Sequence, residues 1–401
     1  MQAGPSLRGY AAVTGAYWAF MLTDGALRML VLLQFHRLGF TPVQLAGLFV
    51  LYEVAGIVTN LTAGWLAARF GLAATLIAGL VLQVAALVAL AQFDPAWAVA
   101  TSVAFVMLVQ GASGVAKDLA KTASKSAVKL LAPPGQGLFR WVAALTGSKN
   151  AVKGAGFFVG AALLGGVGFA PALYLMASGL ALILVAIVAF LPAGLSVRDK
   201  GARITQVFSR DARINWLAAA RLFLFGARDV WFVVALPIWL QASLSAGMPP
   251  ERAFFFTGGF MALWIIFYGA VQAGAPRVVR GAATSALTWV LILALVTGAL
   301  AMTALLTPGW TLVILGGLLV FGAVFAVNSS LHSFLILDYA GAGRVTMDVG
   351  FYYMANAGGR LFGTLMSGVM YQLGGLPAAL AAATAMLLLS AGAMTRLRAA
   401  G

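Results

Sequence analysis

Runs of about twenty mostly apolar residues recur along the whole length of this sequence, separated by short polar connectors. Only 9% of the 401 residues are charged, whereas a soluble protein of this length carries roughly a quarter. An apolar helix of about twenty residues spans the hydrocarbon core of a bilayer. The sequence therefore predicts an all-α membrane protein that crosses the bilayer many times.

The apolar runs predict about twelve transmembrane helices in two halves. The division falls at the most charged connector, so we expect an N-terminal half over 1–193, a cytoplasmic linker over 194–213 and a C-terminal half over 214–401. The expected spans cover 11–36, 42–68, 73–92, 96–118, 140–167, 170–193, 214–241, 252–275, 282–306, 309–333, 346–373 and 376–396.

Features of the first half recur in the second. Asn150 precedes an alanine in the fifth span as Asn356 does in the eleventh, and Gly168 and Gly374 follow them at the same spacing. Gly25 and Arg28 in the first span likewise resemble Gly226 and Arg228 in the seventh, and Lys153 falls near Arg360 in this alignment. Two pseudo-symmetric six-helix halves are typical of secondary transporters, whose binding site lies between the halves near the midplane.

The formal net charge of +15 and the pI near 10.7 reflect mainly basic connectors. The expected inner segments hold most of the Lys and Arg residues, and the expected outer loops hold Arg37 and Arg252 alone. This asymmetry predicts that both termini are cytoplasmic. We expect no nucleic-acid binding, because the sequence predicts no soluble domain that could host it.

The sequence shows no pattern typical of an enzyme. There is no Ser-His-Asp grouping at a supporting periodicity, no phosphate-binding glycine loop and no cluster with metal-ligand spacing. The chain also has no cysteine, which excludes disulfides and thiol ligands. We therefore predict a non-enzyme that needs neither a cofactor nor a metal.

Charged residues inside the predicted spans are the main functional signal. A charge at the bilayer centre costs roughly 2.5–3.5 kcal/mol on insertion scales, so such residues usually mark a transport path. The predicted cations outnumber the anions, and we expect an anionic substrate to supply the missing charge. The cations are Arg28, Lys149, Lys153, Arg221, Arg228 and Arg360, and the anions are Asp24, Glu53, Asp229 and Asp348.

We interpret Arg28 and Arg228 as clamps, because a guanidinium makes paired hydrogen bonds to a phosphate or arsenate. Lys153 and Arg360 are interpreted as flanking cations. Two further cations have structural alternatives: Lys149 could anchor a helix end, and Arg221 could snorkel to the interface. Asn356 and Tyr352 share a helix face with Arg360 and are predicted to add polar contacts.

The predicted intramembrane carboxylates have two possible roles. Asp24 and Glu53 are candidates for coupling export to proton entry, because an isolated buried carboxylate can bind a proton. A permanent ion pair of Asp24 with Arg28, four residues away, is the structural alternative. Asp229 and Asp348 are predicted to take part in coupling or gating.

Two polar groups are more typical of structural roles. Lys117, Lys121, Lys125 and Lys129 recur every four residues and would form a basic stripe if the fourth helix continues to the prolines that follow. Such a stripe is typical of positive-inside topology or lipid contact, although it could attract anions. His332, close to Asn328 in the tenth span, is more typical of a structural residue than of a proton relay.

Two segments resemble motifs of the major facilitator superfamily, and the resemblance covers the whole chain. Gly64–Gly71 is similar to the family's loop motif between helices two and three, and Gln110–Gly114 to the end of its fourth-helix motif. This sequence has Ala68 at the usual Asp of the loop motif and Met107 at the customary Arg. The usual gating ion pair of the family is therefore in doubt, and the chain resembles an outlying branch.

Within that superfamily, the N-terminal half resembles the organoarsenical efflux permeases of bacterial arsenic operons. The similar strings are YWAFMLTDGALRMLVLLQFHRLG, LYEVAGIVTNLTAGWLAARFGL, SGVAKDLAKTASKSAVKLL and LTGSKNAVKGAGFF. The resemblance implies export of 1-arseno-3-phosphoglycerate, which a partner glyceraldehyde-3-phosphate dehydrogenase makes from arsenate. It also implies a multi-pass protein of the bacterial inner membrane, which we expect to act as a monomer. On charge alone, a transporter of another phosphorylated or carboxylated metabolite is the alternative.

Overall fold

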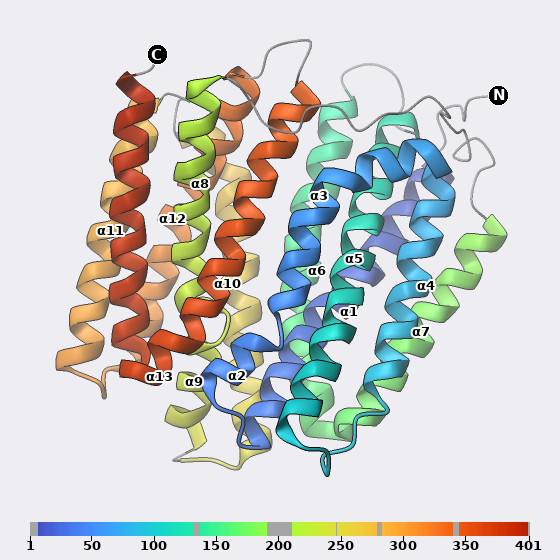
Figure 1. Cartoon of the computed structure of the whole chain (residues 1–401), viewed down its shortest axis with the longest axis horizontal. Coiled ribbons are helices and arrows are strands. Elements are labelled where there is room, and N and C mark those ends of the chain that lie inside the picture. Colours follow the sequence, from blue (N-terminus) through green and yellow to red (C-terminus); the bar gives the residue numbers. More distant parts are fainter. Residues whose placement is uncertain are drawn as a thin grey trace. The chain divides into compact units, whose positions relative to one another are not determined.

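The computed structural model describes residues 7–131, 137–190, 211–245, 247–278, 283–339 and 345–399 (Figure 1). The predicted linker over 194–213 lies outside these residues, apart from its last three positions. Every regular element in the described ranges is a helix. Helices suit a chain of this composition, because the bilayer core offers no water to satisfy backbone groups.

Thirteen helices are present in the described part of the chain. Their bounds are α1 Leu7–Arg37, α2 Pro42–Gly47, α3 Val50–Phe70, α4 Leu72–Leu90, α5 Val99–Leu131, α6 Gly137–Val167, α7 Phe169–Phe190, α8 Ala212–Phe232, α9 Ala235–Ser245, α10 Pro250–Val278, α11 Ala283–Leu306, α12 Thr311–Tyr339 and α13 Val345–Ala399.

These helices supply 11 candidate membrane spans within the described residues. One candidate covers most of α13, whose 55 residues are broken by non-helical Gly374 and Gly375. Gly375 has a φ of 65°, which favours glycine, and Pro377 follows it. Divided at this break, α13 provides two spans, and the fold prediction of about twelve membrane helices is confirmed.

Two predicted spans each contain a break in the helix. The expected span 214–241 is divided into α8 and α9, because Pro237 has no N–H and its ring clashes with the carbonyl of residue 233. The Ser367 hydroxyl accepts hydrogen bonds from the N–H groups of Val234 and Ala235, at 3.1 Å each. The expected span 42–68 is divided into α2 and α3, and a reciprocal Thr41–Gln44 capping box begins α2.

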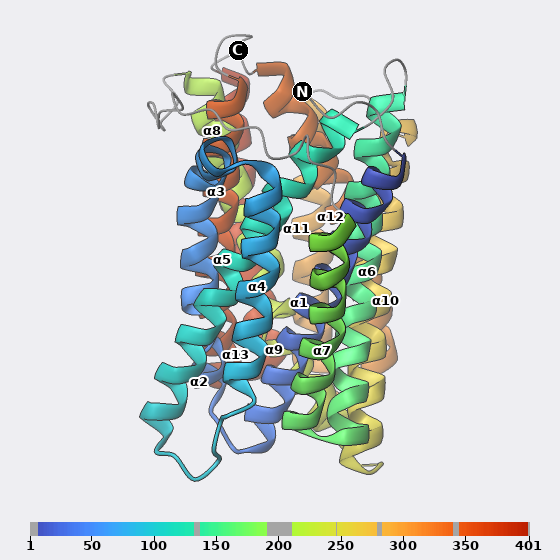
Figure 2. The same cartoon turned by 90° about the vertical axis from the view of Figure 1, so that its right-hand side faces the viewer.

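The chain forms two compact units. Unit 1 contains Met1–Gln34, Val58–Thr205 and Phe254–Ile265, and unit 2 contains Phe35–Ile57, Gln206–Ala253 and Ile266–Gly401. In unit 1, α4 packs against α5 and α7, around buried residues that include Phe20, Leu80 and Leu180 (Figure 2).

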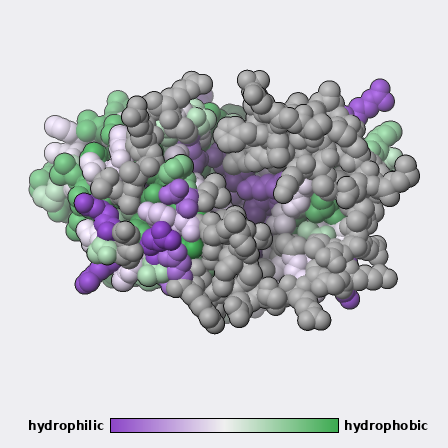
Figure 3. All heavy atoms as spheres, turned by 90° about the horizontal axis from the view of Figure 1, so that it is seen from above, coloured by the Kyte–Doolittle hydropathy of each residue, from purple (hydrophilic) through white to green (hydrophobic). Residues whose placement is uncertain are grey.

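In unit 2, α13 packs against α8 and α11 around a second apolar core, to which Leu217 and Leu331 belong. Large apolar side chains cover the outer faces, such as Leu182 in unit 1 and Leu312 in unit 2, which are 72% and 83% exposed. Seen from above, hydrophilic residues gather where α8 begins and the C-terminal part of α13 ends (Figure 3). Apolar sides and polar helix ends match a bilayer and its interface.

Candidate functional site

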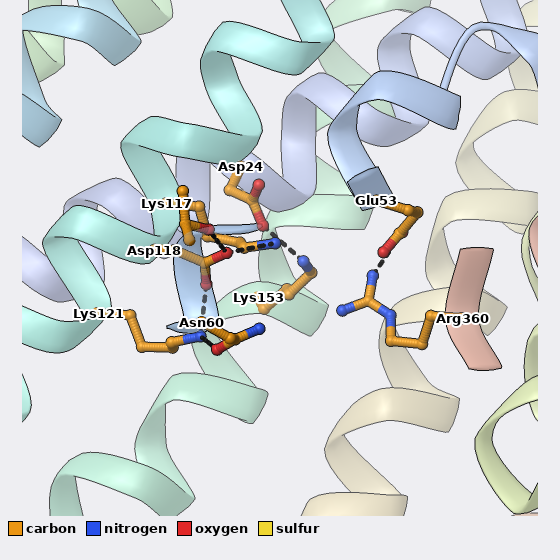
Figure 4. Close-up of polar contacts among 9 residues, drawn as sticks. Asp24, Glu53, Asn60, Lys117, Asp118, Lys121, Lys153 and Arg360 are labelled. Carbon is orange, nitrogen blue, oxygen red and sulfur yellow. Dashed lines mark hydrogen bonds and ion pairs between the residues drawn. The ribbon is translucent and has the colours of Figure 1, made fainter. Parts of the chain in front are cut away.

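Unit 1 contains a buried ion pair between α1 and α6. The Lys153 Nζ donates to the Asp24 Oδ2 at 2.5 Å, and the side chains are 18% and 1% exposed (Figure 4). Asp24 was predicted as a coupling carboxylate and Lys153 as a flanking cation, and the fold brings the two together. The pairing of Asp24 with Arg28 was the alternative drawn from spacing, and Lys153 shows that a partner comes from another helix.

Small residues allow α1 and α6 to approach closely enough for this pair. A Cβ on Gly25 would collide with the backbone carbonyl of Lys153, and a Cβ on Gly160 would collide with the backbone of Ala26. Gly156 similarly faces the backbone of α1. Backbone contact of this kind is typical of membrane helices with small residues at the interface.

Two more predicted cations of unit 1 lie within one helical turn of this pair. Arg28 is four residues after Asp24 on α1 and is partly buried. Lys149 is four residues before Lys153 on α6 and is also partly buried. Beside it, the Trp18 Nε1 donates to the Ser148 Oγ at 2.8 Å. Along α1 and α6, two further predicted cations thus lie about one helical turn from the Asp24–Lys153 pair.

A second polar cluster in unit 1 joins α3 to α5. Asp118 is 1% exposed and pairs with Lys121, while the Thr59 hydroxyl donates to it at 2.6 Å. The Lys121 Nζ also donates to the Asn60 Oδ1 at 2.8 Å (Figure 4). The expected continuation of the fourth helix is confirmed, because α5 extends to Leu131. Its lysine stripe is therefore partly a packed structural cluster.

Unit 2 contains a larger network of ion pairs. Asp229 on α8 is 1% exposed, and its Oδ1 accepts from Arg228 Nε at 2.6 Å. Its Oδ2 accepts from Arg360 Nε on α13 at 3.3 Å. The Arg360 Nη2 also donates to the Glu53 Oε1 at 2.7 Å (Figure 4). Arg360 therefore joins buried carboxylates from α3 and α8.

The α8–α13 crossing resembles the α1–α6 crossing in its backbone contacts. A Cβ on Gly226 would meet the carbonyl of Gly359, and a Cβ on Gly359 would collide with the backbone of Leu222. Gly25 and Gly226 were predicted to correspond. Position 359 corresponds to Lys153 when Asn150 is aligned with Asn356. Gly25 faces Lys153 in unit 1, and Gly226 faces position 359 in unit 2, so the corresponding positions are in contact at the same helix crossing in each unit.

Arg221, one helical turn before Phe225 on α8, occupies a different environment. It is 5% exposed, so the snorkelling alternative is wrong. Its Nε donates to the Asn356 Oδ1 at 3.0 Å, and its Nη1 donates to the Ser329 carbonyl at 3.1 Å. The Tyr352 ring centroid lies 5.0 Å from the guanidinium carbon. The fold thus groups three predicted site residues: Arg221, Asn356 and Tyr352.

The remaining predicted site residue is Asp348. It belongs to the first turns of α13, but its side chain lies outside the described part of the structure. Its expected gating role therefore stays a prediction.

The sequence did not reveal three contacts of these clusters. Glu53 was predicted as a coupling carboxylate without a named partner, and the Glu53–Arg360 pair joins residues 307 positions apart. Ser329 and Thr59 were not predicted to take part. Neither hydroxyl has a charged residue at helical spacing that would have drawn attention to it, because their partners come from other helices.

Charge balance follows from these placements. In unit 1, the partly or fully buried carboxylates are Asp24 and Asp118, and the corresponding cations in the described residues are Arg28, Lys117, Lys121, Lys125, Lys149 and Lys153. In unit 2, the carboxylates are Glu53, Asp211 and Asp229 and the cations are Arg213, Arg221, Arg228 and Arg360. Among the residues that the structure describes, both units therefore have more buried positive than negative charge.

Many apolar spans, an internal repeat and buried charges define a polytopic membrane transporter. The chain belongs to the Major Facilitator Superfamily, whose family model matches residues 11–363. A search of curated protein sequences finds no match.

Solved transporter structures share the fold. A POT family transporter in complex with 5-aminolevulinic acid aligns with a TM-score of 0.76 and 12% identity, over 98% of this chain and 96% of that one. The nucleoside transporter NupG aligns with a TM-score of 0.73 and 16% identity, over 98% and 100%. A bacterial homologue of the iron transporter ferroportin, in the outward-facing state, aligns with a TM-score of 0.68 and 15% identity, over the same shares. At these identities the likeness shows the fold alone.

Proposed function

We propose that this transporter exports an organic anion that carries phosphoryl and arsenyl groups, 1-arseno-3-phosphoglycerate, and thereby confers arsenate resistance. The observation that carries the anionic part is the excess of buried cations over buried carboxylates among the described residues of each unit. An excess of positive charge in a poorly hydrated environment attracts anions, so a negatively charged substrate would bind favourably there. The arsenyl group is supported by the resemblance of the N-terminal half to organoarsenical permeases.

The proposed transport cycle uses the ion pairs as exchangeable contacts. Arg360 is held by Glu53 and Asp229, and Lys153 by Asp24. An oxyanion that binds Arg360 or Lys153 competes with these carboxylates. A carboxylate released inside the membrane is more stable with a proton bound. Export of the anion can in this way be coupled to proton entry, with Asp24 and Glu53 as the carriers.

Arg28 and Arg228 are proposed as substrate contacts in the same cycle. Arg28 lies one turn from Asp24, and Arg228 is held by Asp229 in this structure. Alternating access between the two halves, a cytoplasmic location of both termini and a monomer in the bacterial inner membrane complete the proposal.

A second candidate is the export of another phosphorylated or carboxylated metabolite. The same cation excess favours it, because charge does not distinguish an arsenate ester from a phosphate ester. It differs from the first candidate only in the group that the partner dehydrogenase would add.

The test is arsenic uptake into everted membrane vesicles that contain this protein. The complete mixture holds arsenate, glyceraldehyde 3-phosphate, NAD and glyceraldehyde-3-phosphate dehydrogenase, and the control lacks the dehydrogenase. Uptake only in the complete mixture supports the arsenylated ester. Uptake in the control indicates an inorganic oxyanion carrier, and no uptake in either, with folded protein in the vesicles, favours the second candidate.

A further inference from the structure

Arg221 is a deeply buried cation whose hydrogen bonds go to neutral groups. Its side chain is 5% exposed, and it has no carboxylate within 4.0 Å among the residues that the structure describes. Arg228 and Arg360, in the same unit, each contact Asp229. A guanidinium buried without an anion is expensive, so its retention needs an explanation.

The contacts of Arg221 leave part of its donor fork available. Nε donates to Asn356, and Nη1 donates to the carbonyl and the hydroxyl of Ser329, at 3.1 and 3.3 Å. The second terminal nitrogen, Nη2, makes no hydrogen bond to a described residue. The two N–H groups of Nη2 are therefore the donors of this guanidinium that a phosphate or arsenate oxygen can use.

Rings and hydroxyls fix the orientation of this guanidinium. Its carbon lies 3.9 Å from the Phe225 ring centroid and 5.0 Å from that of Tyr352. The Gln272 amide on α10 donates to the same Ser329 hydroxyl at 3.3 Å. Four helices, α8, α10, α12 and α13, therefore contribute to one polar cluster inside unit 2.

A second, independent observation is that polar atoms beside Ser329 lack hydrogen-bond partners. Asn328 and His332 are fully buried. The Asn328 Oδ1 and both ring nitrogens of His332 make no hydrogen bond with the described part of the chain. His332 follows Ser329 by three residues and Asn328 by four, so all three lie on one side of α12. Buried polar atoms without partners are rare and typically indicate the site of an ordered water, an ion or a ligand.

These observations have a common explanation. We propose that Arg221, with Ser329, Asn328 and His332, forms a tetrahedral-oxyanion subsite in unit 2 that takes the phosphoryl or arsenyl group of the exported anion. The subsite rests on the proposed function for its substrate class. Arg221 supplies charge and the two N–H groups of Nη2, and the His332 imidazole presents an N–H. The Asn328 Nδ2 donates to the Val324 carbonyl at 3.3 Å and has a second N–H for the anion. The residues are closed to solvent here, so the anion binds a conformation in which unit 2 opens around Arg221.

The experiment measures binding of inorganic phosphate, and separately of inorganic arsenate, to the purified full-length protein. The readout is the midpoint of thermal unfolding at rising anion concentration, with acetate and chloride at equal ionic strength as reference anions. The variant is Arg221→Gln. The matched control is Arg213→Gln, which removes an exposed guanidinium from the same helix.

We expect phosphate and arsenate to raise the midpoint saturably in the wild type and in Arg213→Gln. Arg221→Gln should lose this response, and Arg221→Lys should need at least about tenfold more phosphate, because an ammonium lacks the fork. An equal response in the Arg221 and Arg213 variants would overturn the subsite, as would a wild type that responds no more to phosphate than to acetate. If Arg221→Gln does not fold, Arg221→Lys decides, and an unchanged phosphate dependence overturns the proposal.

These outcomes are separate from those of the vesicle assay. Arg221-dependent phosphate binding without uptake of the arsenylated ester would keep the oxyanion subsite and reject the proposed substrate. Uptake of the ester without a phosphate response would keep the proposed function and reject the subsite.

Discussion

The α1–α6 crossing of unit 1 and the α8–α13 crossing of unit 2 have similar backbones and different charges. In each, a glycine of the first helix faces a carbonyl of the second, at Gly25 and Lys153 or at Gly226 and Gly359. In unit 1, the pair Asp24–Lys153 joins the helices. In unit 2, Arg360 contacts both Asp229 and Glu53.

The difference shows that the repeat preserves helix packing more strictly than charge. Close backbone contact requires glycine at fixed positions, so few residues can replace it. An ion pair needs only that opposite charges meet, and these charges can come from different helices. Unit 2 has nearly balanced its buried cations, whereas unit 1 retains several lysines beside two carboxylates.

The largest expected effect comes from substitutions that disrupt the close backbone packing common to the two crossings. Gly160→Leu in unit 1 and Gly359→Leu in unit 2 should each prevent close packing, because the new side chain collides with helix backbone. We expect each substitution to lower the free energy of unfolding by about 3 kcal/mol or more, which is the upper range for overpacking. The measurement is the yield of monodisperse protein in detergent by size-exclusion chromatography.

Matched controls lie in the same helices. A Cβ on Gly166 or on Gly350 meets no atom within 4 Å. Gly166→Leu and Gly350→Leu should therefore give wild-type yields. Equal yields from the Gly160 and Gly166 variants would reject the packing explanation for unit 1.

The second effect distinguishes Arg360, which contacts carboxylates, from Arg221, whose described contacts are with neutral groups. Arg360→Met leaves the carboxylates of Glu53 and Asp229 without this cation, and breaking a buried pair costs about 3–5 kcal/mol. Arg221→Met removes a cation that contacts only neutral described groups, so its main cost is the loss of the donor to Asn356 and Ser329, about 1–3 kcal/mol and less than that of Arg360→Met. Thermal unfolding of both variants in anion-free buffer measures the difference. A fall in midpoint as large for Arg221→Met as for Arg360→Met would show that Arg221 has a charged partner.

The third effect tests whether the Asp24–Lys153 pair of unit 1 contributes less to stability than the ion pairs of Arg360 in unit 2. Asp24→Asn leaves the Lys153 ammonium without its carboxylate, at an expected cost of about 2 kcal/mol for a lost charged hydrogen bond. The cost should be below that of Arg360→Met, because the partly exposed Lys153 can extend its ammonium towards water. The double variant Asp24→Asn with Lys153→Met should recover part of the loss. Additive losses, measured by thermal unfolding, would contradict a direct coupling between the two.

The sequence predicted the membrane helices and the glycine correspondences, because apolar length and small-residue spacing are local signals. It also placed Tyr352, Asn356 and Arg360 on one face of a helix, since residues four apart lie together. It could not reveal that Glu53 contacts Arg360, because that pair depends on tertiary packing. The break between α8 and α9 was readable from Pro237. The neutral described contacts of Arg221 were not, since they depend on which residues of three other helices surround it.

The smallest expected effect concerns a surface ion pair at the start of α8. Asp211 caps this helix, its Oδ1 accepts from the Arg213 N–H at 2.8 Å, and its Oδ2 pairs with the Arg213 side chain. The Arg213 and Asp211 side chains are 42% and 32% exposed, so the charge itself should contribute less than about 1 kcal/mol. Asp211→Asn, which keeps a capping oxygen, should change stability little, and Asp211→Ala should cost about 1 kcal/mol.

The pH dependence of that cap gives a sharper test. The hydrogen bond from the Arg213 side chain is the main reason that the pKa of Asp211 lies below its ordinary value. A carboxyl with a lowered pKa stabilises the folded state above its unfolded-state pKa of about 4, and this contribution disappears as the pH falls through the lowered value. The difference in unfolding midpoint between the wild type and Asp211→Asn should therefore be constant above pH 5 or so and shrink below about pH 4. A difference that persists unchanged in acid would show that Asp211 acts through the shape of its cap, without a contribution from its charge. The buried pairs of the two crossings would then be the ones whose charges stabilise the fold.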